Sequence, residues 1–408
     1  MTETSQDTGS LTIAATMMVR NEEENLARCL NSIKDIVDEI VIVDTGSEDK
    51  TVEIAESFGA RVYHHPWEDN FSLHRNQSMK YAESDWVFVI DADEEVTLGN
   101  GITKETLKRF IKEIPIPRDT ASVAFKVMDM QGGRCVMEFN STRIFKKGMV
   151  HYEGIVHNAP QIHNRNGAAF CDLLRISHFG YDLTPEKKQK KFERTSGLIF
   201  KKLEAEPENW LMYFYLAQVF CEHHDPKKGC EYGEIYIKHK EELRPSKNFN
   251  PSIYFTLVIN NMKIGNALRA KELIFEGFEE IPEDLDLAMA MCEWGVQNKA
   301  LDMLVMGGKQ YTDVFNNWQK DPALYGNRFV FSNNIHCLAQ VLYYMSCSMV
   351  VEGSKYLDIL VNQVFPKLPK ELQEKSLSNV KATLLASTTN IGKKLKKSIK
   401  PLAMVGGQ

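Results

Sequence analysis

The sequence predicts an α/β domain with a mostly parallel sheet, followed by an all-α domain of repeat-like helix pairs. Two observations lead to this prediction. Apolar runs alternate with segments of helical spacing as far as residue 90, whereas the chain after Pro207 has a helical pattern throughout. A length of 408 residues agrees with two or three domains, because a single hydrophobic core stops growing beyond about 250–300 residues.

Four apolar runs near the N-terminus are predicted to be strands, and three segments between them are predicted to be helices. The strands cover residues 11–19, 39–43, 61–63 and 86–90, and the helices cover residues 22–36, 51–58 and 74–82. In the first helix, four apolar residues recur at helical spacing: Leu26, Cys29, Leu30 and Ile33. Strands that alternate with helices favour a parallel sheet, in which ligands bind beyond the carboxyl ends of the strands.

The pattern changes in the second half of this domain. Residues 121–145 contain two strand-like runs around Gly132 and Gly133, which favours an antiparallel extension of the sheet. Residues 150–181 are rich in His and Gly and are expected to be irregular. From Lys187 onward the sequence is charged and helical, so we place the end of the α/β domain at residue 190.

Three stretches of the helical part resemble one another, namely residues 208–239, 252–280 and 283–315. Each begins beside a proline, and the prolines are spaced 44 and 31 residues apart, which brackets the tetratricopeptide period of about 34 residues. Breaks are expected at Gly265-Asn266 and Gln297-Asn298, and capping helices at 324–350 and 367–391. The predicted organisation is a disordered N-terminus (1–10), an α/β domain (11–190), a tetratricopeptide-like domain (191–392) and a basic flexible tail (393–408).

Composition excludes several classes of protein. The net charge of −6 and the pI of about 6.1 provide no basic field for nucleic acid. Eight cysteines are scattered without a C-x-x-C pair, which favours a reducing, cytoplasmic location. Residues 1–10 lack the apolar region of a signal peptide, and no apolar run reaches the roughly 18 residues of a membrane span. We therefore expect a cytoplasmic protein without a transmembrane segment.

Four carboxylates within five residues follow the strand at 86–90: Asp91, Asp93, Glu94 and Glu95. Side chains alternate in an extended segment, so Asp91 and Asp93 share a face and repel each other unless a cation lies beside them. Oxygen ligands suit Mg²⁺ or Mn²⁺ shared with substrate phosphates. The alternative is a strand that ends in water, and Glu94 and Glu95 are interpreted in that way or as the start of a helix.

Other polar residues are expected at the same sheet edge. Asn21 and Asp44 follow the first two strands, and Arg75 begins a predicted helix from which its guanidinium could reach a diphosphate. Glu23 is explained equally well by the dipole of a first helical turn, and a surface salt bridge is the alternative for Arg75. Four histidines fall within 28 residues, and one of them could complete a metal site with the aspartates: His151, His157, His163 and His178.

Several of these segments together resemble a known family. MMVRNEEENLARCLNSI, EIVIVDTGSEDKT, FSLHRN and WVFVIDADE resemble family 2 glycosyltransferases of the GT-A fold, which is Rossmann-like, tightly over residues 11–96 and loosely as far as 181. TRIF at 142–145 and YEGIVH at 152–157 resemble the subgroup with a C-terminal tetratricopeptide-like domain. That subgroup includes the peptide S-glycosyltransferases of the glycocin type.

The resemblance implies a role for each matching residue. Asp44 would contact the nucleotide base or its ribose, and Asn21 and Glu23 would line the nucleoside pocket. Asp91 and Asp93 would form the D-x-D motif, with Asp93 as the direct metal ligand and Asp91 nearer the ribose. His157 would complete the metal shell. Arg75 and Arg143 would face the diphosphate or the donor sugar.

The implied activity is that of an inverting, metal-dependent hexosyltransferase using Mn²⁺ or Mg²⁺. It would transfer a sugar from a nucleotide-sugar, a UDP-sugar, to a peptide, protein or glycan acceptor. The candidates for the catalytic base are Glu153, Asp129 and His178, with Glu153 favoured because it lies near His157 in sequence. A thiol acceptor would need less help from a base, because it is partly ionised near neutral pH.

Two other functions remain open at this point. A nucleotidyltransferase also combines an α/β sheet, carboxylates and Mg²⁺, but no glycine-rich phosphate loop follows the first strand. A non-catalytic binding module would use the helical part alone. Solenoid surfaces often bind extended peptides, and a homodimer through the helical domain is a further expectation.

Overall fold

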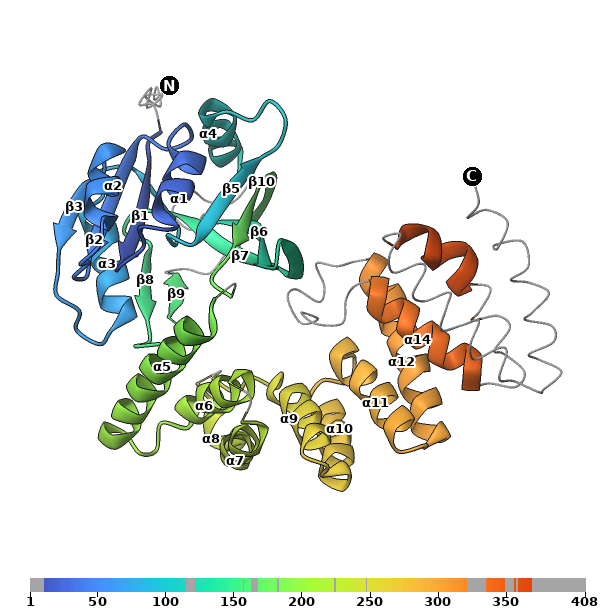
Figure 1. Cartoon of the computed structure of the whole chain (residues 1–408). Helices are drawn as coiled ribbons and strands as arrows, with labels where there is room; N and C mark the ends of the chain where they lie inside the picture. The colour runs from blue at the N-terminus through green and yellow to red at the C-terminus, as the bar shows by residue number, and fades with distance from the viewer. Residues whose placement is uncertain are drawn as a thin grey trace, which may run out of the picture. The chain divides into compact units, whose positions relative to one another are not determined.

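The computed structural model describes residues 11–114, 122–156, 158–162, 168–181, 183–223, 225–246, 248–320, 335–348, 356 and 359–368. The chain divides into two compact units, Met1–Pro207 and Glu208–Gln408 (Figure 1). This division falls later than the boundary at residue 190 that the sequence predicts. The expected disordered N-terminus at 1–10 and the basic tail at 393–408 lie outside the described residues.

The first unit is built on an eight-stranded sheet of order β3-β2-β1-β4-β7-β6-β10-β5. Its strands are β1 (Ile13–Val19), β2 (Glu39–Asp44), β3 (Arg61–His64), β4 (Trp86–Val89), β5 (Glu94–Leu98), β6 (Ser122–Gln131), β7 (Arg134–Lys146) and β10 (Ala169–His178). The strands β3, β2, β1 and β4 are parallel, and β7 pairs antiparallel with both of its neighbours. The predicted parallel sheet with an antiparallel extension is therefore confirmed.

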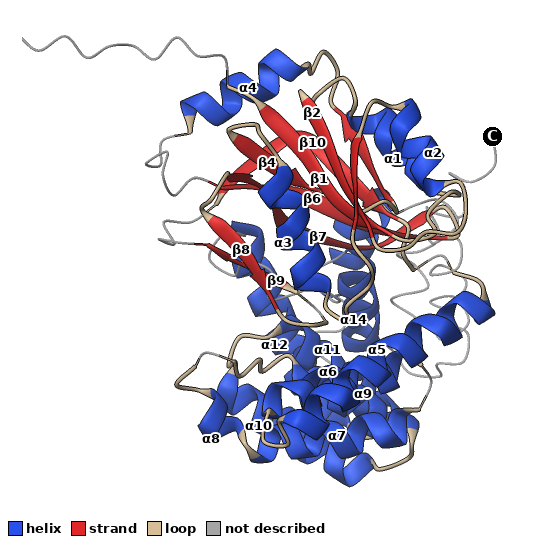
Figure 2. Ribbon diagram, turned by 90° about the vertical axis from the view of Figure 1, so that its left-hand side faces the viewer, coloured by secondary structure: helices blue, strands red, loops and turns tan. Residues whose placement is uncertain are grey.

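Helices cover both faces of this sheet. They are α1 (Leu26–Ile33), α2 (Thr51–Ser57), α3 (Phe71–Tyr81) and α4 (Lys104–Glu113). Helices α1 and α4 share one hydrophobic core with Ile13, Ala15 and Met17, whereas α3 packs with Ala14 and Val41 on the opposite face. Figure 2 shows α3 on one side of the sheet and α1 and α2 on the other. Successive side chains of β1 point to opposite faces of the sheet, so this one strand contributes residues to the hydrophobic core on each face.

The region 150–181 is more regular than the sequence indicates. Strands β8 (Val150–Glu153) and β9 (Ala159–Ile162) form an antiparallel pair, and β10 pairs with β6 and β5. The expectation of an irregular segment is wrong because β10 buries Cys171, Leu174 and Ile176 in the main core. Leu174 and Ile176 are two positions apart, which is the spacing of residues on one face of a strand. The polar residues around them made this pattern difficult to recognise in the sequence.

Helix α5 (Pro185–Ala205) belongs to the first unit, although the sequence assigns most of it to the helical domain. Thr184 caps its N-terminus by accepting a hydrogen bond from the Lys187 N–H, and Pro185 occupies the first turn. Ion pairs of Lys187 with Glu24 and of Lys201 with Asp69 join α5 to loops of the α/β sheet. These contacts between distant residues explain the later boundary.

The second unit consists of antiparallel helix pairs. The helices are α6 (Trp210–Glu222), α7 (Pro226–Lys238), α8 (Lys240–Leu243), α9 (Ile253–Lys263), α10 (Ala267–Glu280), α11 (Leu285–Gln297), α12 (Leu301–Lys320) and α14 (Ile335–Ser348). The pairs α6–α7, α9–α10 and α11–α12 coincide with the three predicted stretches, and the expected breaks separate their helices. A Cβ on Gly307 would lie 2.9 Å from the Ala288 carbonyl oxygen, so this glycine permits the close approach of α12 to α11.

The end of the second unit is described only in part. Helix α14 lies within the expected capping helix at 324–350, and short turns follow at Leu360–Val364 and Phe365–Lys367. The second expected capping helix, at 367–391, lies almost entirely outside the described residues. In the part of the chain that is described, no helix is both long and apolar enough to cross a membrane.

Candidate active site

The acidic residues after β4 meet side chains from four other elements at the carboxyl edge of the sheet. Asp91 and Asp93 follow β4, Asp129 lies in β6, and His178 ends β10. Strands β10 and β6 are parallel and align His178 with Asp129, so both side chains reach the same edge. The topology therefore brings together residues that are 87 positions apart in the chain, from Asp91 to His178.

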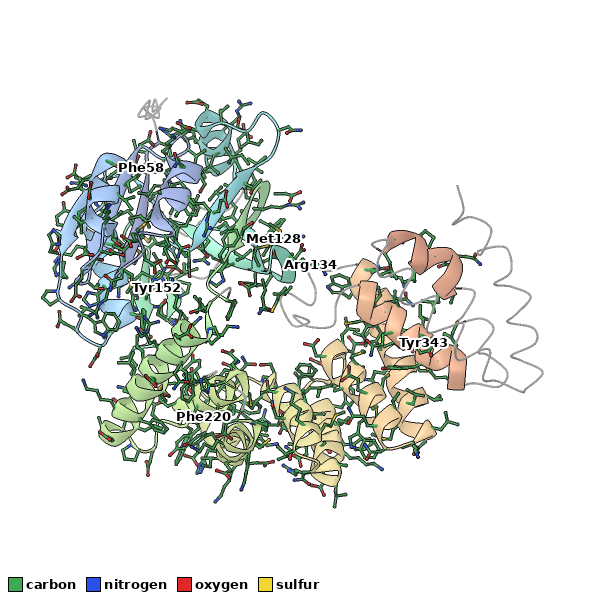
Figure 3. The ribbon with its side chains drawn as sticks, viewed as in Figure 1. Phe58, Met128, Arg134, Tyr152, Phe220 and Tyr343 are labelled. Atoms are coloured by element: carbon green, nitrogen blue, oxygen red, sulfur yellow. The ribbon has the colours of Figure 1, made fainter. Side chains whose placement is uncertain are left out.

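Two arginines hold the carboxylate of Asp91. Arg75 Nη2 donates to Asp91 Oδ1 at 2.8 Å, and Arg143 Nη1 lies 3.9 Å from Asp91 Oδ2. Burial raises the pKa of Asp91, but Arg75 and Arg143 lower it more, so the net effect is a lowered pKa. The Arg75 guanidinium also lies 5.1 Å from the ring centroid of Tyr152, which is labelled in Figure 3.

Asn76 fixes the position of Tyr152. Its amide Nδ2 donates to the Tyr152 carbonyl oxygen at 2.9 Å, and its Oδ1 accepts from the Tyr152 N–H at 2.8 Å. The side chain thus pairs with the backbone of β8 as a neighbouring strand would. Ser72 donates to the Gly154 carbonyl oxygen at 2.6 Å. The FSLHRN segment therefore connects β8 to the acidic residues after β4.

Glu94 is a site residue that the sequence analysis missed. Its side chain is 1% exposed, and Oε1 accepts from Arg143 Nη2 at 2.5 Å while Oε2 accepts from the Asp91 N–H at 2.9 Å. Burial raises the pKa of Glu94 to about 7; Arg143 opposes this effect and Asp91 adds to it. The prediction of a solvated strand exit or helix start is wrong, because Glu94 begins β5. Glu94 stands two positions before the apolar residue Val96, and residues two apart in a strand lie on the same face. This spacing was the signal in the sequence that Glu94 is buried.

His178 links Asp129 to Asp93. Its Nδ1 lies 2.7 Å from Asp129 Oδ1, and its Nε2 lies 3.6 Å from Asp93 Oδ2. Burial lowers the pKa of His178, but hydrogen bonds to Asp129 and Asp93 outweigh this and raise the pKa to about 10. A Cβ on Gly180 would lie 2.5 Å from Asp93 Oδ2 and close to His178 Nε2, so a larger residue here would displace the side chains of this pair.

The donor atoms around Asp93 are compatible with a divalent cation. Mg²⁺ and Mn²⁺ are commonly bound through one or two protein ligands, with water and substrate phosphates completing the shell. Asp93 and His178 present an oxygen and a nitrogen toward each other, and Asp129 orients the imidazole, as in carboxylate–histidine–metal arrangements. Among the described residues, no group of three or more His, Cys, Asp or Glu could hold a metal. His157 lies outside the described residues.

The predicted nucleoside-side residues lie at the same edge and connect two loops. Asp44 is 3% exposed and accepts hydrogen bonds from the N–H groups of Gly46 and Ser47. Asn21 has a φ of 54° and accepts from the Glu48 N–H at 2.8 Å. The Glu23 carboxylate accepts from the Lys50 N–H at 3.2 Å. These bonds hold the loop after β1 against the loop after β2, and contact with a nucleoside stays a prediction.

Glu22 is a second residue that the sequence analysis missed. Its carboxylate accepts from Asn25 Nδ2 at 3.0 Å, and its N–H donates to Thr51 Oγ1 at 2.7 Å. Burial is the main cause of its raised pKa, Asn25 opposes the rise, and Asp93 and Asp91 add to it. Glu22 therefore lies within electrostatic reach of Asp93 and Asp91. Glu22 and Glu23 are neighbours in the acidic run RNEEEN, and nothing in the sequence indicated that Glu22 is the more buried of the two.

Glu153 is the predicted residue that the structure does not join to this cluster. It ends β8, is exposed, and pairs with His151 Nε2 at 2.8 Å. Among the described residues, Glu153 forms no hydrogen bond or ion pair with Asp93 or His178. Asp129 is 1% exposed, and its Oδ2 has no hydrogen-bond partner among the described residues. Of the three candidate bases, two therefore belong to one hydrogen-bonded pair, in which Asp129 is buried and His178 is partly exposed.

Comparison with known proteins matches part of this site, up to residue 145, to a family model. Residues 15–145 match the family model described as glycosyl transferase family 2. Glycosyltransferase SunS of Bacillus phage SPbeta is 30% identical over 215 residues, which cover 50% of this chain and 48% of SunS. A TPR repeat-containing protein of Synechococcus elongatus is 50% identical over 86 residues, or 21% of each chain. The chain thus spans about half, or less, of the length of these curated relatives.

Solved structures with low overall similarity were also found. Residues 1–349 of TarS from S. aureus, in complex with UDP-GlcNAc, align with a TM-score of 0.33 and 15% identity, covering 76% of this chain and 92% of that chain. Glucosyl-3-phosphoglycerate synthase from Mycobacterium tuberculosis, in complex with Mn²⁺, UDP and glucosyl-3-phosphoglycerate, aligns with a TM-score of 0.31 and 17% identity, covering 48% of this chain and 79% of that chain.

Proposed function

We propose that this protein, whose residues 15–145 are a family 2 glycosyltransferase domain, transfers a sugar from a UDP-sugar to a peptide, protein or glycan acceptor. The observation that carries the proposal is the convergence of Asp91, Asp93, Asp129 and His178 at the carboxyl edge of the sheet. Doubly wound sheets bind ligands at this edge. A cluster of paired charges at a ligand-binding edge, with Asp129 fully buried in it, is costly for folding and is characteristic of functional sites.

We assign the metal position to Asp93 and His178, with His178 in the role that the resemblance implies for His157. Asp129 holds Nδ1 of His178, so Nε2 is left to face Asp93, and a metal that binds there would displace the Nε2 proton. A bound Mn²⁺ or Mg²⁺ supplies positive charge that stabilises the departing diphosphate. Asp91, held by Arg75 and Arg143, keeps its negative charge and accepts a hydrogen bond from a ribose hydroxyl of the donor.

The acceptor attacks from the face of the sugar opposite the diphosphate, which inverts the anomeric carbon. Neither Asp129 nor His178 is suited to remove the acceptor proton, because Asp129 is buried against the imidazole and His178 serves the metal. Glu153 is therefore the base that we propose for a hydroxyl acceptor. A cysteine thiol would reach the reactive state with less assistance, because part of it is thiolate near neutral pH.

A donor screen tests the proposal directly. The purified protein is incubated with Mn²⁺ and a panel of UDP-, GDP- and TDP-sugars, and release of nucleoside diphosphate is followed with and without a chelator. We expect chelator-sensitive release from one or two UDP-sugars. Pyrophosphate release from a nucleoside triphosphate would instead favour a nucleotidyltransferase. If no donor is cleaved and calorimetry detects no nucleotide binding with Mn²⁺ present, the binding-module alternative replaces the enzyme.

A further inference from the structure

The two arginines that the resemblance assigns to the diphosphate are engaged elsewhere. Arg75 is 8% exposed and bonded to Asp91, and the Arg143 side chain is 13% exposed and bonded to Glu94. Their positive charge neutralises carboxylates of the protein itself. A nucleoside diphosphate carries two phosphate groups, so a cation besides the metal is needed to balance them. That cation must come from another element at the same edge.

Helix α5 crosses this edge of the sheet. Near its start, Lys187 pairs with Glu24 in the loop after β1, and near its end Lys201 pairs with Asp69 in the loop before α3. The two lysines are separated by 14 residues, or about 21 Å of helix. Both loops follow the carboxyl ends of parallel strands, so α5 spans the region where a donor would bind (Figure 1).

Two cations lie between these anchors on the same face of α5. Lys191 and Arg194 follow Lys187 by four and seven positions, which places all three on one stripe of the helix. Lys191 Nζ lies 3.4 Å from the Gly180 carbonyl oxygen and 4.7 Å from the ring centroid of Tyr181. Gly180 packs directly against Asp93 and His178. Lys191 is therefore a close neighbour of the proposed metal pair.

Arg194 lies beside the first residue of α3. Its guanidinium carbon is 5.2 Å from the ring centroid of Phe71, and its side chain is open to solvent. Within the described residues, neither Arg194 nor Lys191 forms an ion pair with a carboxylate, in contrast to Lys187 and Lys201 on the same helix. Partial desolvation where the guanidinium packs on Phe71 lowers the pKa of this exposed arginine; nearby Glu22 opposes the shift and Arg20 adds to it. Arg194 thus lies near Glu22 but forms no ion pair with it.

We propose that Lys191 and Arg194 bind the diphosphate of the nucleotide donor, so that α5 completes the donor site. The inference rests on the proposed function. Arg194 offers the planar fork that matches phosphate oxygens, and Lys191 offers a compact point charge next to Asp93. Their spacing of three residues on one helical face suits two adjacent phosphates.

Binding measurements with UDP and with uridine isolate the phosphate contacts. We expect Arg194→Ala and Lys191→Ala each to weaken UDP binding in Mn²⁺ by about 10- to 100-fold, because a charge-assisted hydrogen bond is lost. Uridine binding should be unchanged. Arg194→Lys should retain part of the UDP affinity. Arg109→Ala is the matched control, since Arg109 is an exposed arginine in the middle of α4.

The outcomes separate this inference from the proposed function. If the wild-type protein does not bind UDP, both are overturned. If the wild type binds UDP and Arg194→Ala binds it equally well, only the role of α5 is overturned. Equal losses for UDP and uridine, or a lowered melting temperature that Arg194→Lys does not restore, would indicate a structural role for Arg194 and would also overturn the inference.

Discussion

The two units differ in where their ion pairs lie. In the first unit, Asp91, Glu94 and Asp129 converge on one edge of the sheet, and Glu94 and Asp129 are buried there. In the second unit, partly exposed ion pairs join neighbouring helices: Arg269 with Glu234, Glu272 and Glu276, and Lys240 and Arg244 with Glu280. Buried charge costs folding energy and is kept where chemistry needs it, whereas surface charge connects helices at little cost.

The largest effect that this contrast predicts is on catalysis. Asp93→Asn removes a carboxylate that we place at the metal, so Mn²⁺-dependent release of nucleoside diphosphate should fall by at least about 100-fold. The melting temperature should be nearly unchanged, because Asp93 forms no short ion pair with an arginine or lysine among the described residues. Glu272→Gln on α10 is the control and should leave the rate unaltered. A D93N variant with wild-type activity would remove the metal assignment.

The next effect is on stability. Arg143→Ala leaves Glu94, which is 1% exposed, without its cationic partner, so the free energy of unfolding should fall by about 3–5 kcal/mol. Denaturant titration measures this loss. Adding Glu94→Gln to Arg143→Met should restore much of the stability, because no buried charge is then left unpaired. If R143A cost less than 1 kcal/mol, as surface pairs do, the contrast between the two units would fail.

A smaller effect, on metal affinity, is expected for Asp129, which contacts the proposed metal ligand His178. Asp129→Asn removes the negative charge that orients and polarises His178, so Mn²⁺ affinity in the presence of UDP should fall by about 10- to 100-fold. Calorimetry at fixed UDP concentration measures the change. Affinity for UDP without metal serves as the internal reference and should be retained. If D129N lost both its Mn²⁺ affinity and its metal-free UDP affinity, the substitution would have disrupted the structure of the site, and the positioning role of Asp129 would be contradicted.

The smallest effect belongs to the second unit. Burial raises the pKa of Glu280, but Lys240 and Arg244 lower it further, so the net shift is downward. A lowered folded-state pKa stabilises the protein above the unfolded value and loses that contribution as the pH falls through the folded value. Glu280→Gln should therefore cost about 0.5–1 kcal/mol at pH 7 and nothing below about pH 3. A stability difference that persists at low pH would exclude an electrostatic origin.

The sequence was sufficient for most of the fold and for part of the site. Alternation and helical spacing located β1 to β4 and the three helix pairs, because each pattern is local and regular. Asp91 and Asp44 were recognisable because they follow apolar strands directly. The carboxyl edge was therefore predictable before any coordinate was known, since parallel strands place their ends together.

What escaped prediction depends on contacts between distant residues. Glu94 looked like surface charge until Arg143, 49 positions away, supplied its partner. The relation of His178 to Asp93 depends on β10 lying parallel to β6, which no local pattern in residues 150–181 indicated. Helix α5 was assigned largely to the helical domain because a charged, helical pattern begins at Lys187, whereas its ion pairs with Glu24 and Asp69 tie it to the first unit.

The position of α5 has a consequence for how such proteins are recombined. If this helix carries part of the donor site, the catalytic unit does not end where the sheet ends. An exchange of helical units between relatives would have to join the chains after Ala205, where α5 ends. A junction at residue 190 would replace Lys191 and Arg194 with whatever the incoming module carries. Exchange of the helical unit at that junction would then alter donor binding as well.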